Sequence, residues 1–319
     1  MNLALNGAVE QGLLFAIMAL GVYLTFRILN FPDLTVDGSF ALGGAIGAKL
    51  IIAGYNPLIA TVIAMLAGAL AGAITGILTT KGKINGLLAG ILTMIALYSV
   101  NLRIMDRANL PLLREDTLYT YAQNLHIPDL RIPELHILGL DVGGITILTG
   151  VALIFLVFVA IVKGLIDWFM HTQIGLGLRA TGDNPAMIRS FGINTDSTTI
   201  IGLSLSNALV ALSGALIAQY QGFADVGMGI GMIVIGLASV IVGEVIFGHQ
   251  SLFRATLAVI LGSVVYRLVI ALALRAGLSP SDMKLITAVL VIFALTLPNM
   301  VKGVWRKTNS GIKGGKTHA

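Results

Sequence analysis

The sequence has no cysteine, and only 11% of its 319 residues are charged. Without thiols the chain can form no disulfide, no cysteine metal site and no thiol nucleophile. A soluble domain carries about 25% charged residues, so this chain has too little polar surface to cover a globule of its length. The shortage of charge excludes an ordinary water-soluble protein.

What the chain has instead is apolar surface. Hydrophobic residues make up 56% of it, its mean hydropathy is +0.93, and it contains 38 glycines. Membrane helices tolerate glycine and use it for close packing. We therefore expect an all-α, polytopic integral membrane protein. Its basic residues are scattered over loop ends and the tail, which suits membrane orientation and gives no reason to expect nucleic-acid binding.

The apolar runs are long enough to count as spans, since a span needs about 20 mostly apolar residues. The first ten residues hold Glu10 and no Lys or Arg, so we expect no cleavable signal peptide and a retained first span. We predict a single transmembrane domain over 1–301 and a basic, disordered tail over 302–319 near anionic lipid. The predicted helical bundle has about nine spans, with eight or ten as alternatives, at 7–27, 38–55, 57–79, 85–104, 144–163, 199–220, 229–248, 256–276 and 284–300.

The distribution of basic residues orients these spans. With the C-terminal tail in the cytoplasm, the inner segments hold twelve Lys and Arg residues and the outer segments six. Cytoplasmic segments carry the excess of positive charge. This orientation places the polar loop 105–143 outside the cell and the loop 172–198 inside it.

The stretch 175–196, GLGLRATGDNPAMIRSFGINTD, is a polar segment between two long apolar segments, and it is called the polar island below. Asn184 is a good helix N-cap, Pro185 suits the first helical position, and Gly192 suits a left-handed stop, so a short helix is predicted from Ala186 to Phe191. So short a helix needs support from the rest of the protein or from a partner. It is either a connector on the membrane surface or a docking helix.

Close packing is predicted for Gly68, Gly72 and Gly76, which lie four residues apart on one face of the third span. Such small-residue ridges let helix backbones approach each other. We expect packing within one subunit, with a subunit interface as the alternative.

The sequence contains no convincing nucleotide-binding or metal-binding motif. Gly315-Lys316-Thr317 resembles the end of a phosphate-binding loop, but Ser310 stands where that loop requires glycine. The five histidines, at 126, 136, 171, 249 and 318, have no ligand spacing. We expect no enzyme activity, no metal site and no cofactor bound by this chain.

Ionisable residues in or beside the spans are functional candidates, because charge inside a membrane is costly. They are Glu10, Asp33, Asp37, Asp225, Glu244 and Arg267. They either line a polar path for a solute or serve as caps and internal ion pairs, such as Glu244 with Arg267. Phe223 and Asp225 repeat the spacing of Phe31 and Asp33 at an offset of 192 residues. The predicted topology puts the two runs on opposite sides of the membrane, as an inverted repeat would.

Several motifs resemble those of ABC-importer permeases of the branched-chain amino acid and simple-sugar class. Gly175, Arg179 and Ala180 match the family's Gly-x-x-x-Arg-Ala segment, and Gly192-Ile193-Asn194 matches the Gly-Ile-Asn that ends its short helix. LSGALIAQYQGF and ALGVYLTFRILNFPDLTVDGSFALGGA are also similar to family segments. FPDLTVDGSF resembles the branch described as tryptophan/tyrosine transport permeases. Glu244 departs from the glycine-rich runs of better-known members, so the solute should not be copied from them.

The resemblance implies a permease in the bacterial plasma membrane, built from two related inverted halves, that imports an amino acid or related small polar solute by alternating access. It also implies a homodimer, two cytoplasmic ATPases that bind ATP and Mg, and an extracytoplasmic solute-binding protein. The ATPase-coupling residues would be Arg179, Asp183, Asn184, Pro185, Met187, Ile188, Arg189 and Gly192. The alternative is an ATP-independent secondary transporter or channel that uses intramembrane carboxylates.

Overall fold

The structure is a computed structural model that describes residues 2–113, 115–125, 130–131, 135–137, 140–142, 146–248, 250–277, 285, 287–289 and 292. Most of the predicted span 284–300, the whole tail 302–319 and parts of the predicted loop 105–143 lie outside these residues.

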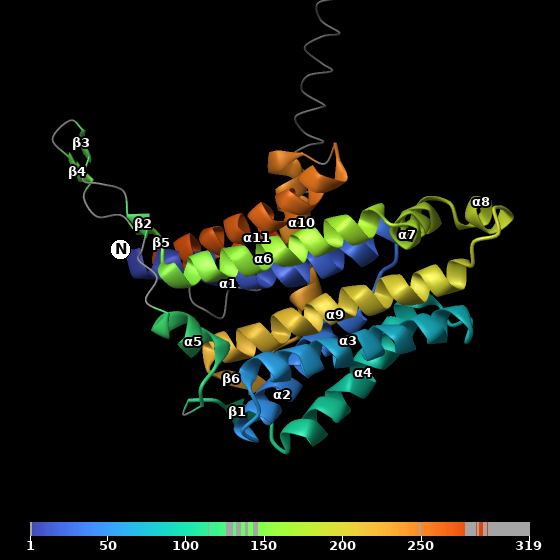
Figure 1. Ribbon diagram of the computed structural model, residues 1–319, viewed down its shortest axis with the longest axis horizontal. Helices are drawn as coiled ribbons and strands as arrows, with labels where there is room; N and C mark the ends of the chain where they lie inside the picture. Colours follow the sequence, from blue (N-terminus) through green and yellow to red (C-terminus); the bar gives the residue numbers. More distant parts are fainter. Residues whose placement is uncertain are drawn as a thin grey trace, which may run out of the picture.

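Long apolar helices dominate the described chain (Figure 1). Seven are long and apolar enough to cross a membrane, and α10 (Met232–Phe247) is a shorter apolar helix. The seven are α1 (Asn2–Tyr23) with its π-helical extension η1 (Leu24–Ile28), α2 (Thr35–Ile52), α3 (Pro57–Thr80), α4 (Gly86–Met105), α6 (Gly150–His171), α9 (Thr195–Gln221) and α11 (Leu252–Arg275). The predicted polytopic helical fold is confirmed.

Short elements close the two ends of the bundle. At one end, called the α8 end, lie α7 (Gln173–Asp183) and α8 (Pro185–Ser190) (Figure 1). At the other, called the β1 end, α5 (Leu118–Asn124) lies beside β1 (Asn109–Pro111), which pairs antiparallel with β6 (Phe223–Asp225). Two more antiparallel pairs follow α5: β2 (Leu130–Arg131) with β5 (Thr146–Leu148), and β3 (Leu135–Ile137) with β4 (Leu140–Val142).

Helix α9 is the centre of the bundle, with α2 and α3 on one side and α1 on the other. A side chain at Gly68 or Gly72 of α3 would meet the α9 backbone at Asn207 or Leu203, and one at Gly76 would meet Ile200. The three glycines therefore serve helix packing within the subunit, as predicted, because only glycine permits this approach.

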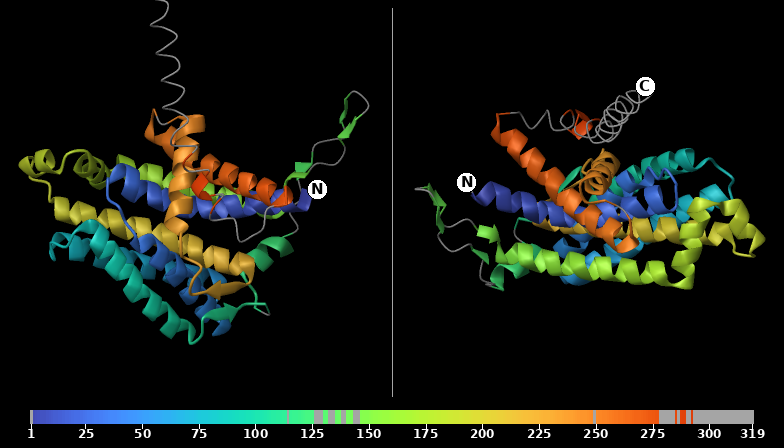
Figure 2. Two further views of the ribbon diagram at one scale, coloured as in Figure 1. Left: turned by 180° about the vertical axis from the view of Figure 1, so that it is seen from behind. Right: turned by 90° about the horizontal axis from the view of Figure 1, so that it is seen from above.

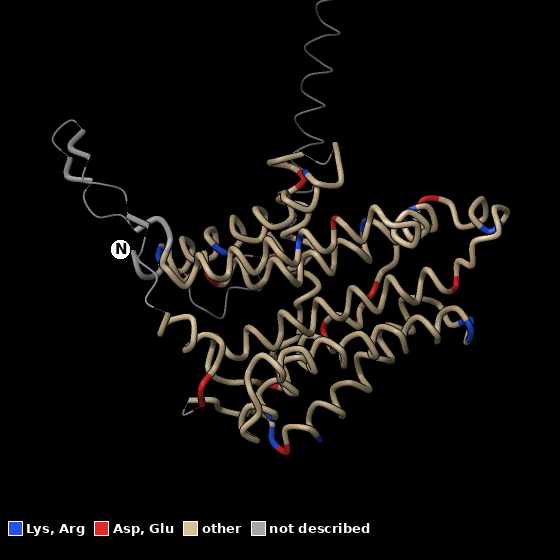
Figure 3. The backbone as a smooth tube through the Cα atoms, in the orientation of Figure 1, with Lys and Arg blue, Asp and Glu red and all other residues tan. Residues whose placement is uncertain are grey.

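Charged side chains are sparse along the long helices (Figure 3). One prediction needs correction here: the fifth span was placed at 144–163, but the helix runs over Gly150–His171. Lys163 is consequently not in a cytoplasmic segment. It is buried inside α6, where it forms an ion pair with Asp167 and lies over the Phe253 ring at 3.6 Å. This i,i+4 pairing explains how the span can continue past a charge.

Helix α10 is the exception to the common direction. It runs across the long axis of the bundle in the left view of Figure 2 and packs against α11 and α1. The turn that leads into it lies against α2, since a side chain at Gly229 would meet the backbone of Asp37. Its N-terminus is therefore inside the protein.

Candidate functional site

The polar island folds as two short helices. Asn184 Oδ1 accepts a hydrogen bond from Met187 N at 3.0 Å and so caps α8, with Pro185 at its first position. After Phe191 the backbone reverses at Gly192, whose φ is +83°. The predicted cap and stop are confirmed, and the predicted helix is displaced by one residue. Helix α7, which carries Arg179 and Asp183, was not predicted.

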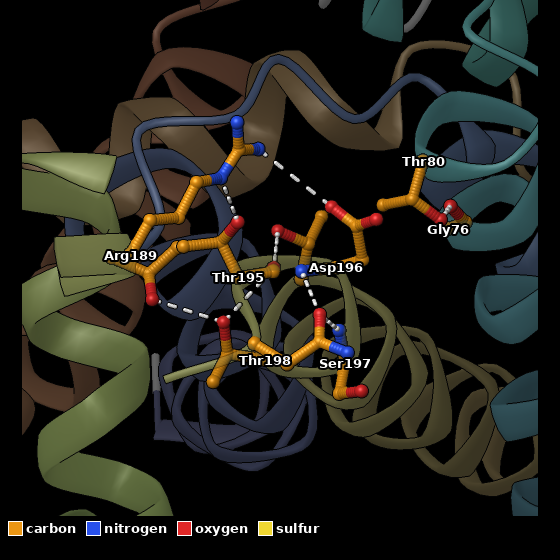
Figure 4. A network of polar contacts seen from close by, with 10 residues as sticks. Gly76, Thr80, Arg189, Thr195, Asp196, Ser197 and Thr198 are labelled. Carbon is orange, nitrogen blue, oxygen red and sulfur yellow. Dashed lines mark hydrogen bonds and ion pairs between the residues drawn. The ribbon is translucent and has the colours of Figure 1, made fainter. Parts of the chain in front are cut away.

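Arg189 fixes α8 to the first turn of α9 (Figure 4). Its Nε donates to Thr195 Oγ1 at 2.6 Å, and its Nη2 lies 3.7 Å from Asp196 Oδ1. Asn194 caps α9 in turn, because its Oδ1 accepts from the backbone N–H of Asp196 and Ser197. The two helices are thus joined rigidly although α8 has only six residues.

The surface of α8 is partly apolar. Ile188 faces the protein and is 5% exposed, whereas Met187 is 49% and Phe191 74% exposed. Ile193 is also exposed. The exposed apolar side chains around α8 thus gather at one end of the membrane bundle, and an apolar surface in such a place is typical of an interaction site.

Arg179 and Asp183 lie away from this surface. Together with Arg27 of η1 and Gln250 before α11, they line a cavity of 260 Å³ at the α8 end. Gly182 packs so closely on Ile28 that a side chain there would clash with the backbone of η1. A displacement of α7 would therefore be transmitted to η1 and to α1.

Asp33 is buried among α2, α3 and α9. Its Oδ1 accepts from Thr35 N at 2.9 Å, and its Oδ2 accepts from Asn207 Nδ2 at 2.7 Å. A chain of hydroxyls extends this network, from Thr35 to Thr75 at 2.8 Å and from Thr75 to Thr93 at 3.0 Å. Both carboxylate oxygens are hydrogen-bonded, so Asp33 links the start of α2 to α9, and the hydroxyls continue the network to α3 and α4.

Asp37 fixes the start of α10 in a similar way, through hydrogen bonds to both of its carboxylate oxygens. Its two carboxylate oxygens accept from Gly231 N at 2.9 Å and Ile233 N at 2.8 Å. The first N–H groups of a helix have no partner within the helix, and a carboxylate also suits the positive end of its dipole. Asp37 therefore allows α10 to begin inside the bundle.

Glu10 lies near the β1 end and is almost fully buried. Its Oε1 accepts from Thr149 Oγ1 at 2.5 Å, and its Oε2 accepts from Tyr220 OH at 3.1 Å. The Tyr220 ring packs edge-on against Tyr119 and Phe155. Glu10 thereby joins α1 to the start of α6 and the end of α9.

Glu244 does not pair with Arg267, and that interpretation was wrong. Glu244 accepts from both Nε and Nη2 of Arg27, with a shortest distance of 2.6 Å. Arg267 instead lies over the ring of Phe15, with its Cζ 3.8 Å from the ring centroid. The spacing of 23 residues between Glu244 and Arg267 gave no measure of their separation in space.

Asp225 lies in β6 at the β1 end, apart from the interior acids. It accepts from Gly227 N at 2.7 Å, which matches the bond from Thr35 N to Asp33. The two similar runs therefore share a turn and lie at different places in the bundle. An inverted repeat stays a prediction.

Sequence reasoning missed the partners of these acids. Arg27, Thr149 and Asn207 come from helices 139 to 217 residues away in sequence from the acids that they contact. No local spacing signals such a contact. The exception is Lys163 with Asp167, whose i,i+4 spacing could have identified the pair. Among the described residues, no group of three or more His, Asp or Glu could hold a metal ion.

Comparison with known families gives one match over nearly the whole chain. A family model described as "Branched-chain amino acid transport system / permease component" matches residues 4–296. The tyrosine transport system permease protein of Clostridioides difficile is 42% identical over 300 residues, which cover 94% of this chain and 92% of that one.

Two further relatives extend the comparison. An uncharacterized protein of Rickettsia prowazekii is 34% identical over 93% of this chain and 98% of its own. The ribose import permease protein RbsC of Escherichia coli K12 is 27% identical, covering 73% of this chain and 67% of its own. Among solved structures, PsaBC from Streptococcus pneumoniae in complex with Fab has a TM-score of 0.49 and 16% identity, covering 90% and 89% of the two chains.

Proposed function

This chain belongs to the family of permease components of branched-chain amino acid transport systems, and from that premise we propose that it imports an aromatic amino acid, driven by a separate ATPase that docks on α8. The relative with 42% identity is a tyrosine transport system permease, which supports a tyrosine-like solute. ATP and Mg would be bound by the ATPase, and this chain would supply the path.

The observation that carries this proposal is the construction of α8. A connector would need neither the Arg189 clamp to Thr195 nor the exposed side chains of Met187 and Phe191. A docking helix needs both, because a partner can transmit force only through a rigid element that offers contact area. The close packing of Gly182 on Ile28 then continues the route to α1.

Charge supports the α8 end as the cytoplasmic side. Lys83 and Arg189 line one cavity there, and Arg27 and Arg179 line another. Positive residues gather on the cytoplasmic side of membrane proteins. We place the chain in the bacterial plasma membrane with the β1 end outside, where a solute-binding protein would deliver the solute, and with a second copy of the permease completing the complex.

The test is reconstitution of the full chain with its co-purified ATPase in liposomes. We expect tyrosine uptake when ATP is available to the ATPase and none when the ATP is replaced by a non-hydrolysable analogue. Uptake without ATP, driven by a proton or sodium gradient, would contradict the proposal in favour of a secondary transporter. The bonding of Glu10, Asp33, Asp37 and Glu244 to groups within the protein argues against that alternative.

A further inference from the structure

Arg267 is a cation within a membrane-spanning helix, and among the described residues it has no carboxylate partner. Its Nε is buried and has no hydrogen-bond acceptor in the part of the chain that the structure describes. The Phe15 ring, 3.8 Å from Cζ, offsets only part of the desolvation of the guanidinium. An unpaired cation in an apolar setting is unfavourable, so its presence within a span points to a function.

Three other cations on or beside the long helices differ in this respect. Arg27 holds Glu244, Lys163 holds Asp167, and Lys49 holds Asp106. The fold supplies a carboxylate to each of these three cations, whereas no carboxylate in the described part of the chain pairs with Arg267.

That position opens onto a cavity of 460 Å³ between α1 and α11. Its volume lies in the range of pockets that hold small molecules. The small residues Gly7 and Ala8 make room on α1, and the apolar side chains of Ile270 and Leu274 line α11. Arg275, the last residue of α11, also lines the cavity, which therefore reaches from Arg267 toward the β1 end.

We propose that this cavity binds the carboxylate of the transported amino acid on Arg267, an inference that rests on the amino-acid transport proposed above. A guanidinium presents two parallel N–H groups that match the two oxygens of a carboxylate. Phe15 fixes the plane of the guanidinium, and Ile270 and Leu274 contact the apolar part of the solute. Arg267 would thus be a specificity determinant on the side from which the solute arrives.

Another oxyanion could occupy the same place, namely the phosphate of an anionic lipid headgroup. Both ligands would satisfy the guanidinium, but only an amino acid also uses the volume of the cavity beside Ile270. The cavity therefore suits the carboxylate of the solute better than a lipid phosphate, and the experiment below distinguishes the two ligands.

The experiment measures the reaction of Arg267 with phenylglyoxal, an arginine reagent, by mass spectrometry of the full chain in nanodiscs. The discs contain either phosphatidylcholine alone or phosphatidylcholine with phosphatidylglycerol, and the probes are L-tyrosine and tyramine, which lacks the carboxylate. We expect L-tyrosine to slow the modification at least fivefold in both discs, and tyramine to leave it unchanged. Arg254, at the other end of α11, serves as the control and should react equally throughout.

Equal rates with tyrosine and tyramine would overturn the proposal. Protection by phosphatidylglycerol alone would assign the cavity to a lipid and overturn it as well. Absence of any modification would do the same, because it would show a cavity closed to molecules of this size. No ATPase is needed, so the result is independent of whether the chain drives uptake with ATP.

Variants separate binding from a structural role. Arg267→Leu removes an unpaired charge, so the full chain should keep or raise its thermal midpoint while the protection by tyrosine is lost. Arg267→Lys keeps the charge but loses the paired N–H groups, so the protein should need at least tenfold more tyrosine for half-maximal uptake. A large fall in the thermal midpoint of Arg267→Leu would make Arg267 a structural residue.

Discussion

The α8 segment and the interior acids (Glu10, Asp33, Asp37 and Glu244) are both polar regions of an apolar protein. They differ in the distance along the sequence between the residues that contact each other. Around α8 each polar contact spans only a few residues, as in the bond of Asn184 to Met187 and that of Arg189 to Thr195. Asp37 instead caps a helix that begins about 194 residues later. Local contacts make a compact element that can move as a unit, whereas distant contacts fix helices to one another.

The largest effect should come from the exposed side of α8. In the double variant Met187→Asp, Phe191→Asp, charges replace the apolar side chains that would contact the ATPase. An unpaired charge in an interface costs several kcal/mol, so ATP-driven uptake should fall by about tenfold or more. Uptake and ATPase association in proteoliposomes measure this. Leu113→Asp, at an apolar position of the β1 end that is even more exposed, is the control. Unchanged uptake in the double variant would remove α8 from the interface.

The next effect concerns the cap of α10. Asp37→Ala would leave the N–H groups of Gly231 and Ile233 without an acceptor inside the protein. Each such group costs about 1–3 kcal/mol, so the unfolding free energy should fall by about 2–6 kcal/mol. Thermal unfolding of the full chain in nanodiscs measures it, with Asp37→Asn expected to recover part of the loss and Asp116→Ala, an exposed acid, as the control. If Asp37→Ala lowered the stability no more than Asp116→Ala does, Asp37 would not be the cap of α10.

A smaller and more local effect is expected at the cap of α8. Asn184→Ala removes one helix cap, which is worth about 1 kcal/mol. Because the contacts of α8 are local, hydrogen exchange should increase at 185–190 and stay unchanged in α9. Asn184→Ser, which keeps a capping oxygen, should exchange like the original protein. A change that spread to α2 and α10 would show that the two regions are not separate.

The predicted helix at α8 shows how much of the site can be obtained from the sequence. Asn184, Pro185 and Gly192 act on their immediate neighbours in the chain. Their roles as cap, first helical residue and stop can therefore be predicted from the sequence. The partner of Glu244 cannot be predicted in the same way, because it lies far away in the sequence. Arg27 and Arg267 were equally available cations, and only the packing of α1 and its extension η1 beside α10 brought Arg27 to Glu244.

The smallest effect concerns the surface pair at the β1 end. Lys49 Nζ donates to Asp106 Oδ2 at 2.5 Å, and this bond holds the pKa of Asp106 below its ordinary value of 3.8. A lowered carboxyl pKa stabilises the fold above the ordinary value, and the gain is lost as the pH falls through the lowered value. The small difference in thermal midpoint between the protein and Asp106→Asn should therefore vanish in acid and shrink in high salt. A difference that grew on acidification would contradict this pairing.

The sequence by itself determined the class of the protein, most of its described spans and the capped helix between α6 and α9. It could do so because hydropathy, glycine spacing and capping are properties of residues close together along the chain. Only the tertiary structure decided what the charges do. It gave Glu10, Asp33, Asp37 and Glu244 partners from distant helices and left Arg267 facing a cavity, because the packing of helices sets distances that no spacing in the sequence encodes.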